Sequence, residues 1–310
     1  MKRKKLVVAS VSLCLLFCTA LGAWTAGSSS AVSSSVRGKY LAAKGVILPP
    51  DEVHVDTFIA TVGYNYPLPR TGVGLNLFAG HRQVSNSGQE EIVQIGVQGG
   101  KQEFEDLPPL NIAFVIDKSG SMSAQDKMDW VKQAFDIFIE RVRDQDFVAL
   151  VVFDDNARVL FTTTRMSTRD KRLRFQREVH NIQPGGGTNL VDGLKLGYQQ
   201  VLANYREDYT NRVLFLTDGM GDSNGILDMA ATYKEMGINV STIGVGQDFD
   251  LELMDQLARR GGGSSRFISD RKEMEEIFGS ELDRMVVPVA TNLELRLEFY
   301  QGVEILETWG

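Results

Sequence analysis

Four nearly continuous apolar runs recur along the chain from residue 110 onward. They cover residues 112–116, 147–153, 213–216 and 240–245. Runs without polar alternation predict strands that are buried on both faces, as in a parallel sheet. The stretches between the runs are long enough to hold helices.

Helical periodicity fills those stretches. Within residues 126–143 the apolar side chains recur at spacings of three and four, which predicts an amphipathic helix with Ser123 as its N-cap. Further helices are expected at residues 190–205, 226–236, 251–259 and 273–285. Alternating strands and helices predict an α/β fold over residues 107–288: a doubly wound, mostly parallel sheet with helices on both faces.

The sequence on either side of this region has a different hydrophobic pattern. Residues 51–106 contain short strand-like segments broken by glycine, at 53–62, 74–78 and 91–97, and form an N-terminal β-rich region. Residues 289–310 return to strand-like sequence at 293–299 and 303–306 and begin a C-terminal β region. Because each fragment is too short to bury a core alone, we expect the two to pair as a separate β region.

The N-terminus predicts export. Basic residues 2–5 precede residues 6–26, which carry no charge, and a serine-rich tract follows. Residues 1–26 are therefore expected to be a cleaved signal peptide or an uncleaved membrane anchor, and residues 27–50 a linker. The position of the basic residues places the body of the protein outside the cytoplasm, in the periplasm or at the cell surface.

The net charge of the chain and the positions of its cysteines limit the kinds of partner and site that it can have. The net charge of −7 includes the basic N-terminal cluster, so the rest of the chain is more acidic still. An acidic body argues against nucleic acid as a partner and is compatible with cation binding. Cys14 and Cys18 both lie in the apolar N-terminal segment, so the body has no disulfide, thiolate ligand or cysteine nucleophile.

Oxygen-bearing side chains gather where the predicted strands end. The sequence IDKSGSMS (116–123) follows the first run, Asp218 follows the third run, and the loop PGGGTN (184–189) precedes a helix. Ligands of open α/β sheets bind at the carboxyl ends of the strands. The candidates are Asp117, Ser119, Ser121, Thr188 and Asp218. Three interpretations are open: plain turns, a nucleophilic serine or a metal site.

The residue types favour the metal site. A nucleophile elbow needs glycine two positions before the serine, but the residue two positions before Ser119 is Asp117. A catalytic triad also needs a histidine base. An EF-hand would need glutamate at its twelfth position, which is Met128. Carboxylates and hydroxyls are hard donors that select Mg²⁺, Mn²⁺ or Ca²⁺ over zinc or copper. Turns account for each loop singly but poorly for all three together.

The segments DKSGSMS, GGGTNL and LFLTDG, in this order, resemble the von Willebrand factor type A domain with a complete metal-ion-dependent adhesion site, Asp-x-Ser-x-Ser, Thr and Asp. The flanks EVHVDTFIATVGYNYPLP and PPLNIAFVID resemble a bacterial exported subfamily. The resemblance implies that Ser119, Ser121 and Thr188 coordinate the cation directly. Asp117 and Asp218 would act mainly through water and by holding the hydroxyls. Lys118, often a small or apolar residue in the subfamily, is expected to point to solvent.

The resemblance also implies a function: an extracytoplasmic, metal-dependent protein-binding module for adhesion or scaffolding, not an enzyme. Mg²⁺ is the first expectation for the cation, with Ca²⁺ or Mn²⁺ as alternatives. A protein partner would supply an Asp or Glu to the open position beside Thr188, Gly187 and Asn189. The alternatives are a membrane-anchored subunit of a larger complex and a metal-dependent hydrolase, whose base would come from Asp154, Asp155 or Asp222.

Overall fold

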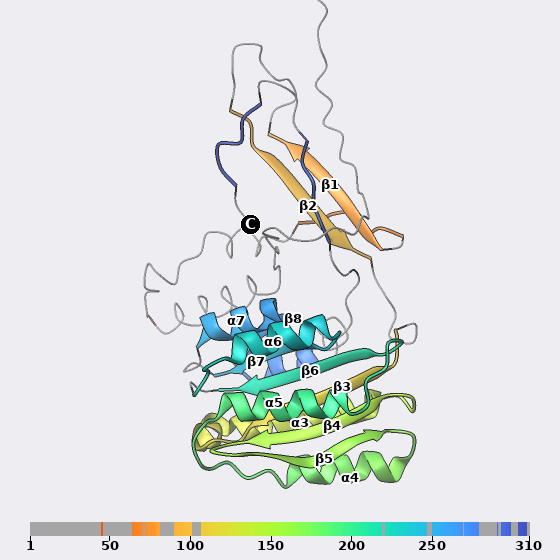
Figure 1. Cartoon of the computed structure of the whole chain (residues 1–310), viewed down its shortest axis with the longest axis vertical. Coiled ribbons are helices and arrows are strands. Elements are labelled where there is room, and N and C mark those ends of the chain that lie inside the picture. Colours follow the sequence, from red (N-terminus) through yellow and green to blue (C-terminus); the bar gives the residue numbers. More distant parts are fainter. Residues whose placement is uncertain are drawn as a thin grey trace, which may run out of the picture. The chain divides into compact units, whose positions relative to one another are not determined.

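The chain forms two compact units, one of which contains residues 63–101 and 289–310 and the other residues 102–288 (Figure 1). The computed structural model describes residues 45, 64–70, 72–80, 90–100, 107–218, 221–246, 250–268, 270–278, 290, 293–298 and 303–308. The predicted export segment and the predicted strand at 53–62 lie outside the described residues. No helix within these ranges combines the length and apolar character needed to cross a bilayer.

The smaller unit contains a two-stranded antiparallel sheet. Strand β1 (Val73–Ala79) pairs with β2 (Val93–Gly99), and Asn76 lies opposite Gly96. Both strands were expected from the sequence. The predicted C-terminal strands are wrong in their described parts, because residues 293–298 and 303–308 have no strand conformation. Their apolar alternation buries no face in the described residues: Leu293, Leu295 and Leu297 are all exposed.

The larger unit is built on a six-stranded sheet in the order β5-β4-β3-β6-β7-β8. All neighbours are parallel except β5, which runs antiparallel to β4 at one edge. The strands are β3 (Leu110–Asp117), β4 (Phe147–Phe153), β5 (Ala157–Arg165), β6 (Thr210–Thr217), β7 (Asn239–Val245) and β8 (Gly262–Ile268). The four predicted strands are thus the four central ones of this sheet.

Helices cover both faces of this sheet, as predicted (Figure 1). They are α3 (Lys127–Arg141), α4 (Arg169–His180), α5 (Leu190–Leu202), α6 (Ile226–Glu235), α7 (Leu251–Arg260) and α8 (Arg271–Glu276). One core cluster joins the sheet to α3, α4 and α8, and a second joins it to α5, α6 and α7. Alternate residues of β3 divide between the two: Phe114 enters the first cluster and Val115 the second. Because β3 is buried on both faces, its sequence is one nearly continuous apolar run.

In the larger unit, two edge strands and one helix cap differ from the sequence prediction, and α4 was not among the expected helices. The edge strands β5 and β8 were not predicted, since their exposed or half-buried positions and polar residues leave no continuous apolar run. Ser123 does not cap α3: its hydroxyl donates to the Gly120 carbonyl within a 3₁₀ turn, Gly120–Asp126. Helix α3 begins only after Asp126, whose backbone is left-handed at φ 56°.

The order of the strands creates a topological switch point at one end of the sheet. From β3 the chain moves outward to β4 and β5, then crosses back to β6 on the other side of β3 and continues to β7 and β8. The loops that leave β3 and β6 therefore diverge, which is the point where open α/β sheets bind ligands. Asp117 ends β3, and Asp218 directly follows β6. Topology thus places both predicted carboxylates at the switch point.

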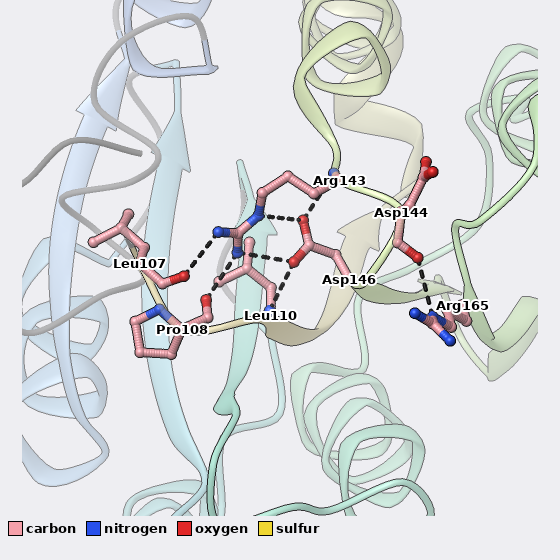
Figure 2. Close-up of polar contacts among 7 residues, drawn as sticks. All are labelled: Leu107, Pro108, Leu110, Arg143, Asp144, Asp146 and Arg165. Atoms are coloured by element: carbon pink, nitrogen blue, oxygen red, sulfur yellow. Dashed lines mark hydrogen bonds and ion pairs between the residues drawn. The ribbon is translucent and has the colours of Figure 1, made fainter. Parts of the chain in front are cut away.

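A different polar cluster holds the opposite end of β3 (Figure 2). The buried Asp146 carboxylate accepts from the backbone N–H of Leu110 at 2.9 Å, and from the backbone N–H and guanidinium of Arg143 at 2.9 to 3.1 Å. Arg143 also donates to the carbonyls of Leu107 and Pro108, both at 2.8 Å. The cluster joins the start of β3 to the turn after α3, with its carboxylate paired by a cation.

Candidate metal centre

Asp117 is the innermost residue of the site. Its side chain is fully buried at the end of β3, where Oδ1 accepts from the Ser119 N–H at 2.7 Å and Oδ2 accepts from the Thr217 hydroxyl at 2.7 Å. Burial raises the pKa of Asp117 above its ordinary value. The hydrogen bonds from Ser119 and Thr217 oppose this rise, and the nearby Asp218 carboxylate adds to it. Asp117 is therefore a buried carboxylate whose described hydrogen-bond partners are all neutral donors.

The two serines of the first loop link the two carboxylates. Ser119 Oγ and Ser121 Oγ lie 3.0 Å apart, and Ser121 donates to Asp218 Oδ1 at 2.7 Å. Asp117, Ser119, Ser121 and Asp218 thus form a continuous series of hydrogen bonds across the switch point, of which the first is donated by the Ser119 backbone N–H. Asp218 is buried, whereas Ser121 is exposed, so the series runs from the core to the protein surface.

The third loop lies against the first through backbone hydrogen bonds. The Gly185 N–H donates to the Lys118 carbonyl at 2.7 Å, and the Gly120 N–H donates to the Gly186 carbonyl at 3.0 Å. These bonds bring the segment before α5 to the same rim as Asp117. The three loops that carry the predicted oxygen donors therefore lie at one end of the sheet.

Thr188 follows this contact and is half-buried. On its C-terminal side, the Asn189 N–H donates to the Asp154 carbonyl at 2.8 Å, and the Asn189 side chain caps α5 by accepting from the Asp192 N–H at 3.0 Å. Asn189 also forms an isolated bridge to Asp222 in the loop after β6. Gly187 is closely packed: a Cβ there would lie 2.5 Å from Asp155 Oδ1. The predicted partner-binding residues are therefore part of the same rim.

Lys127 belongs to the site although the sequence analysis did not single it out. It is the first residue of α3, only 4% exposed, and its Nζ donates to Asp218 Oδ2 at 2.6 Å. A lysine at the start of an amphipathic helix usually faces water, but the spacing of Lys127 to Val131 and Phe135 places it on the apolar face of α3. The close pairing of a buried ammonium with a candidate site carboxylate emerges only from the fold.

Lys118 does not point to solvent as predicted. The residue is 7% exposed, its ammonium pairs with Asp154, and its Nζ lies 3.4 Å from the Gly185 carbonyl. Burial alone would raise the pKa of Asp154, but the hydrogen bond from Lys118 and the N–H of Asn156 outweigh it and hold that pKa below its ordinary value. These partners replace the water that a solvent-facing lysine would have. Asp154 is therefore a paired carboxylate, poorly suited to be a hydrolytic base.

The donor set fits a hard divalent cation. Among the described residues, no three His, Cys, Asp or Glu side chains gather as a metal-binding group, so a cation here depends on hydroxyls as well as carboxylates. The oxygens of Asp117, Ser119, Ser121 and Asp218 supply that combination without sulfur or imidazole. Such ligands suit Mg²⁺, Mn²⁺ or Ca²⁺.

Comparison with known proteins agrees with this fold. The family described as "von Willebrand factor type A domain" matches residues 111–280. The chain is 26% identical over 217 residues to the uncharacterized protein YfbK of Escherichia coli K12, which covers 68% of this chain and 37% of YfbK. It is 28% identical over 163 residues to calcium-activated chloride channel regulator 1 of Bos taurus, which covers 52% of this chain and 17% of that protein.

A solved structure gives the same result for the fold. The von Willebrand factor type A protein from Catenulispora acidiphila superposes with a TM-score of 0.52 at 20% identity, over 68% of this chain and 49% of that one. At this identity the likeness concerns the fold alone. The matched region spans little more than a third of YfbK, so the activity of such longer relatives does not transfer directly.

Proposed function

The chain belongs to the von Willebrand factor type A domain family, and from this premise we propose that it binds a protein partner through a divalent cation held at the carboxyl ends of β3 and β6. The main support is the continuous series of hydrogen bonds from the buried Asp117 through Ser119 and Ser121 to Asp218. Turns alone do not require two buried carboxylates at one point, because buried carboxylates repel and are costly to desolvate.

Each residue of the site has a proposed role. Ser119, Ser121 and Thr188 present neutral hydroxyl oxygens to the cation. Asp117 and Asp218 hold these hydroxyls and act through water. When bound, the cation supplies an electrophilic position that an anionic oxygen can complete, and we propose Mg²⁺ for it, with Ca²⁺ or Mn²⁺ as alternatives.

The partner is proposed to be a protein that presents an Asp or Glu side chain. Ser121 is exposed, and Thr188, Gly187 and Asn189 are half-buried on the same rim, which leaves the site accessible from one side. We further propose that the protein acts outside the cytoplasm, directed there by residues 1–26, and that it binds without catalysing a reaction. The pairing of Asp154 with Lys118 supports the latter, because it removes a candidate base.

The test compares partner capture with metal binding. Proteins of the extracytoplasmic fraction are crosslinked to the full chain in Mg²⁺ or in chelator and identified by mass spectrometry, for the wild type, Thr188→Ala and Thr164→Ala. Thr164 is the control, since it is also half-buried but lies in β5 opposite Val148, near the other end of the sheet. Mg²⁺ affinity is measured in parallel by calorimetry.

We expect the wild type and Thr164→Ala to capture the partner in Mg²⁺ and to lose it in chelator. Thr188→Ala should keep most of its Mg²⁺ affinity, because two serines and two acids remain, but lose the partner. Capture that is insensitive to chelator, or a Thr188→Ala protein that captures as well as the wild type, would show that the three loops do not form an adhesion site.

A further inference from the structure

We propose that Lys127 is an internal counter-cation of the metal site: it neutralises Asp218, keeps that carboxylate from ligating the metal directly, and thereby lowers the resting affinity for the cation. This inference rests on the proposed function. It assigns to a residue outside the predicted ligand set the role of adjusting how much negative charge the site offers to a metal.

The contacts of Asp218 occupy both of its oxygens. Oδ1 accepts from the Ser121 hydroxyl at 2.7 Å, and Oδ2 accepts from the Lys127 ammonium at 2.6 Å. The Asp218 and Lys127 side chains of this pair are 0% and 5% exposed, so water does not compete strongly for either partner. A direct bond from Oδ2 would bring the cation next to a buried ammonium, and the repulsion between these two positive charges opposes such a bond. Asp218 is thus held in a position from which it acts through Ser121.

The backbone near the end of β7 leaves room for the lysine. Gly246, just after β7, has φ +86°, and a Cβ at this position would lie 2.6 Å from Lys127 Cε. A side chain here would be strained by the backbone conformation and would also press on the lysine stem. The path of Lys127 from α3 to Asp218 is therefore built by two elements that are distant in sequence.

The charge count gives the consequence. Asp117 and Asp218 provide two negative charges, and Lys127 returns one positive charge to the same buried cluster. A divalent cation in such a site keeps an excess positive charge. Hence the cation is bound less tightly at rest, and an anionic oxygen from a partner gains more by joining it. Without Lys127, the two carboxylates alone would balance the cation.

A purely structural ion pair would behave differently. If Lys127 only joined α3 to the loop after β6, removing its charge would lower stability and leave metal affinity unchanged. If Lys127 instead supported metal binding by orienting Asp218, its removal would weaken the affinity, as is usual for residues that orient metal ligands. Only the counter-cation role predicts tighter binding when the charge is removed.

The experiment measures Mn²⁺ binding to the full chain by electron paramagnetic resonance and Mg²⁺ and Ca²⁺ binding by calorimetry. The variants are Lys127→Met, which removes the charge, and Lys127→Gln, which removes the charge but keeps a donor for Asp218. Lys127→Arg keeps the charge, and Lys195→Met removes an exposed lysine of α5 as the control. Circular dichroism in chelator establishes which variants are folded. If Lys127→Met is not folded, Lys127→Gln alone serves as the charge-removing variant.

We expect Lys127→Met and Lys127→Gln to bind Mn²⁺ roughly 10- to 100-fold more tightly than the wild type, the size of effect typical of groups next to metal ligands. Lys127→Arg and Lys195→Met should bind as the wild type does. Unchanged or weaker binding by both charge-removing variants would overturn the inference and leave the proposed function intact. A wild-type protein that binds none of Mn²⁺, Mg²⁺ and Ca²⁺ would instead refute the proposed function.

Discussion

Two buried aspartates lie at opposite ends of β3, and they differ in what surrounds them. Asp146, near the start of the strand, accepts from backbone N–H groups and from the Arg143 guanidinium (Figure 2). Asp117, at the other end, accepts only from neutral donors of Ser119 and Thr217 among the described residues, and it faces Asp218. Burial alone therefore does not mark a functional carboxylate. Asp117 differs from Asp146 in that its described partners are all neutral donors and a second carboxylate lies nearby.

The most direct test of the difference between the two aspartates is a substitution at Asp146. Asp146→Ala leaves Arg143 without its carboxylate and the Leu110 N–H without its acceptor, so we expect a loss of about 3–5 kcal/mol in the free energy of unfolding. The loss should be the same in Mg²⁺ and in chelator, as measured by urea denaturation. The exposed Asp208 provides the control variant, Asp208→Ala, which should stay within about 0.5 kcal/mol of the wild type. A loss of stability that depends on metal would mean that the two ends of β3 are energetically coupled.

The opposite end should respond to metal. At a Mg²⁺ concentration of about a hundred times its dissociation constant, the wild type should gain about 2.7 kcal/mol of stability over its value in chelator. Asp117→Asn should lose this gain, because the replacement removes the charge that the cation neutralises. Denaturation in Mg²⁺ and in chelator measures both. Equal gains in the two proteins would exclude Asp117 from the metal site.

A smaller effect concerns pH in chelator. The pKa of Asp117 is raised in the folded state by burial, so the folded protein binds this proton more readily than the unfolded chain does. The resulting stability is present below the ordinary pKa of 3.8 and is lost as pH rises through the raised value. Asp117→Asn lacks this group, so its stability relative to the wild type should increase with pH over that window. A constant difference between the two proteins from acid to neutral pH would contradict the expectation.

The smallest effect is expected for the ion pair on the rim. The Asp154 side chain is 23% exposed, so its pairing with Lys118 is partly screened by water. Lys118→Met should therefore cost about 1 kcal/mol or less. Thermal denaturation against Lys195→Met measures the difference. A cost as large as that of Asp146→Ala would show that the rim is held by charge pairing as firmly as the start of β3.

Much of the larger unit follows from its sequence pattern, and the reason is two-sided burial. Strands such as β3 and β6 touch a core on each face and so must be apolar throughout, which makes them visible as runs. The edge strand β5 has one partner strand and mixed exposure, and the sequence of its Thr162–Thr164 segment does not indicate a buried strand. The C-terminal segments show the reverse error, because alternating leucines at 293–297 suggested a strand that the described residues do not form.

The candidate oxygen ligands could be proposed from sequence because the strand ends of a parallel sheet converge, whatever the details of the loops. The two lysines could not be placed in this way. Lys118 and Lys127 are both buried against carboxylates, although lysines in a turn and at a helix start usually face water. Only Lys127 has the spacing of a buried helix face. The location of both lysines depends on which loops lie opposite them, and that is a property of the tertiary structure.

Strand β3 also has a mechanical consequence. Its start is joined to Arg143 through Leu107 and Pro108, and its end carries Asp117. It is hydrogen-bonded along its length to parallel neighbours on both sides, β4 and β6. Tension applied between the point where the chain enters this unit and a ligand held at the rim would run along β3. The strand could then slip only by shearing both ladders at once, so the ligand would be held along the direction in which the sheet yields least.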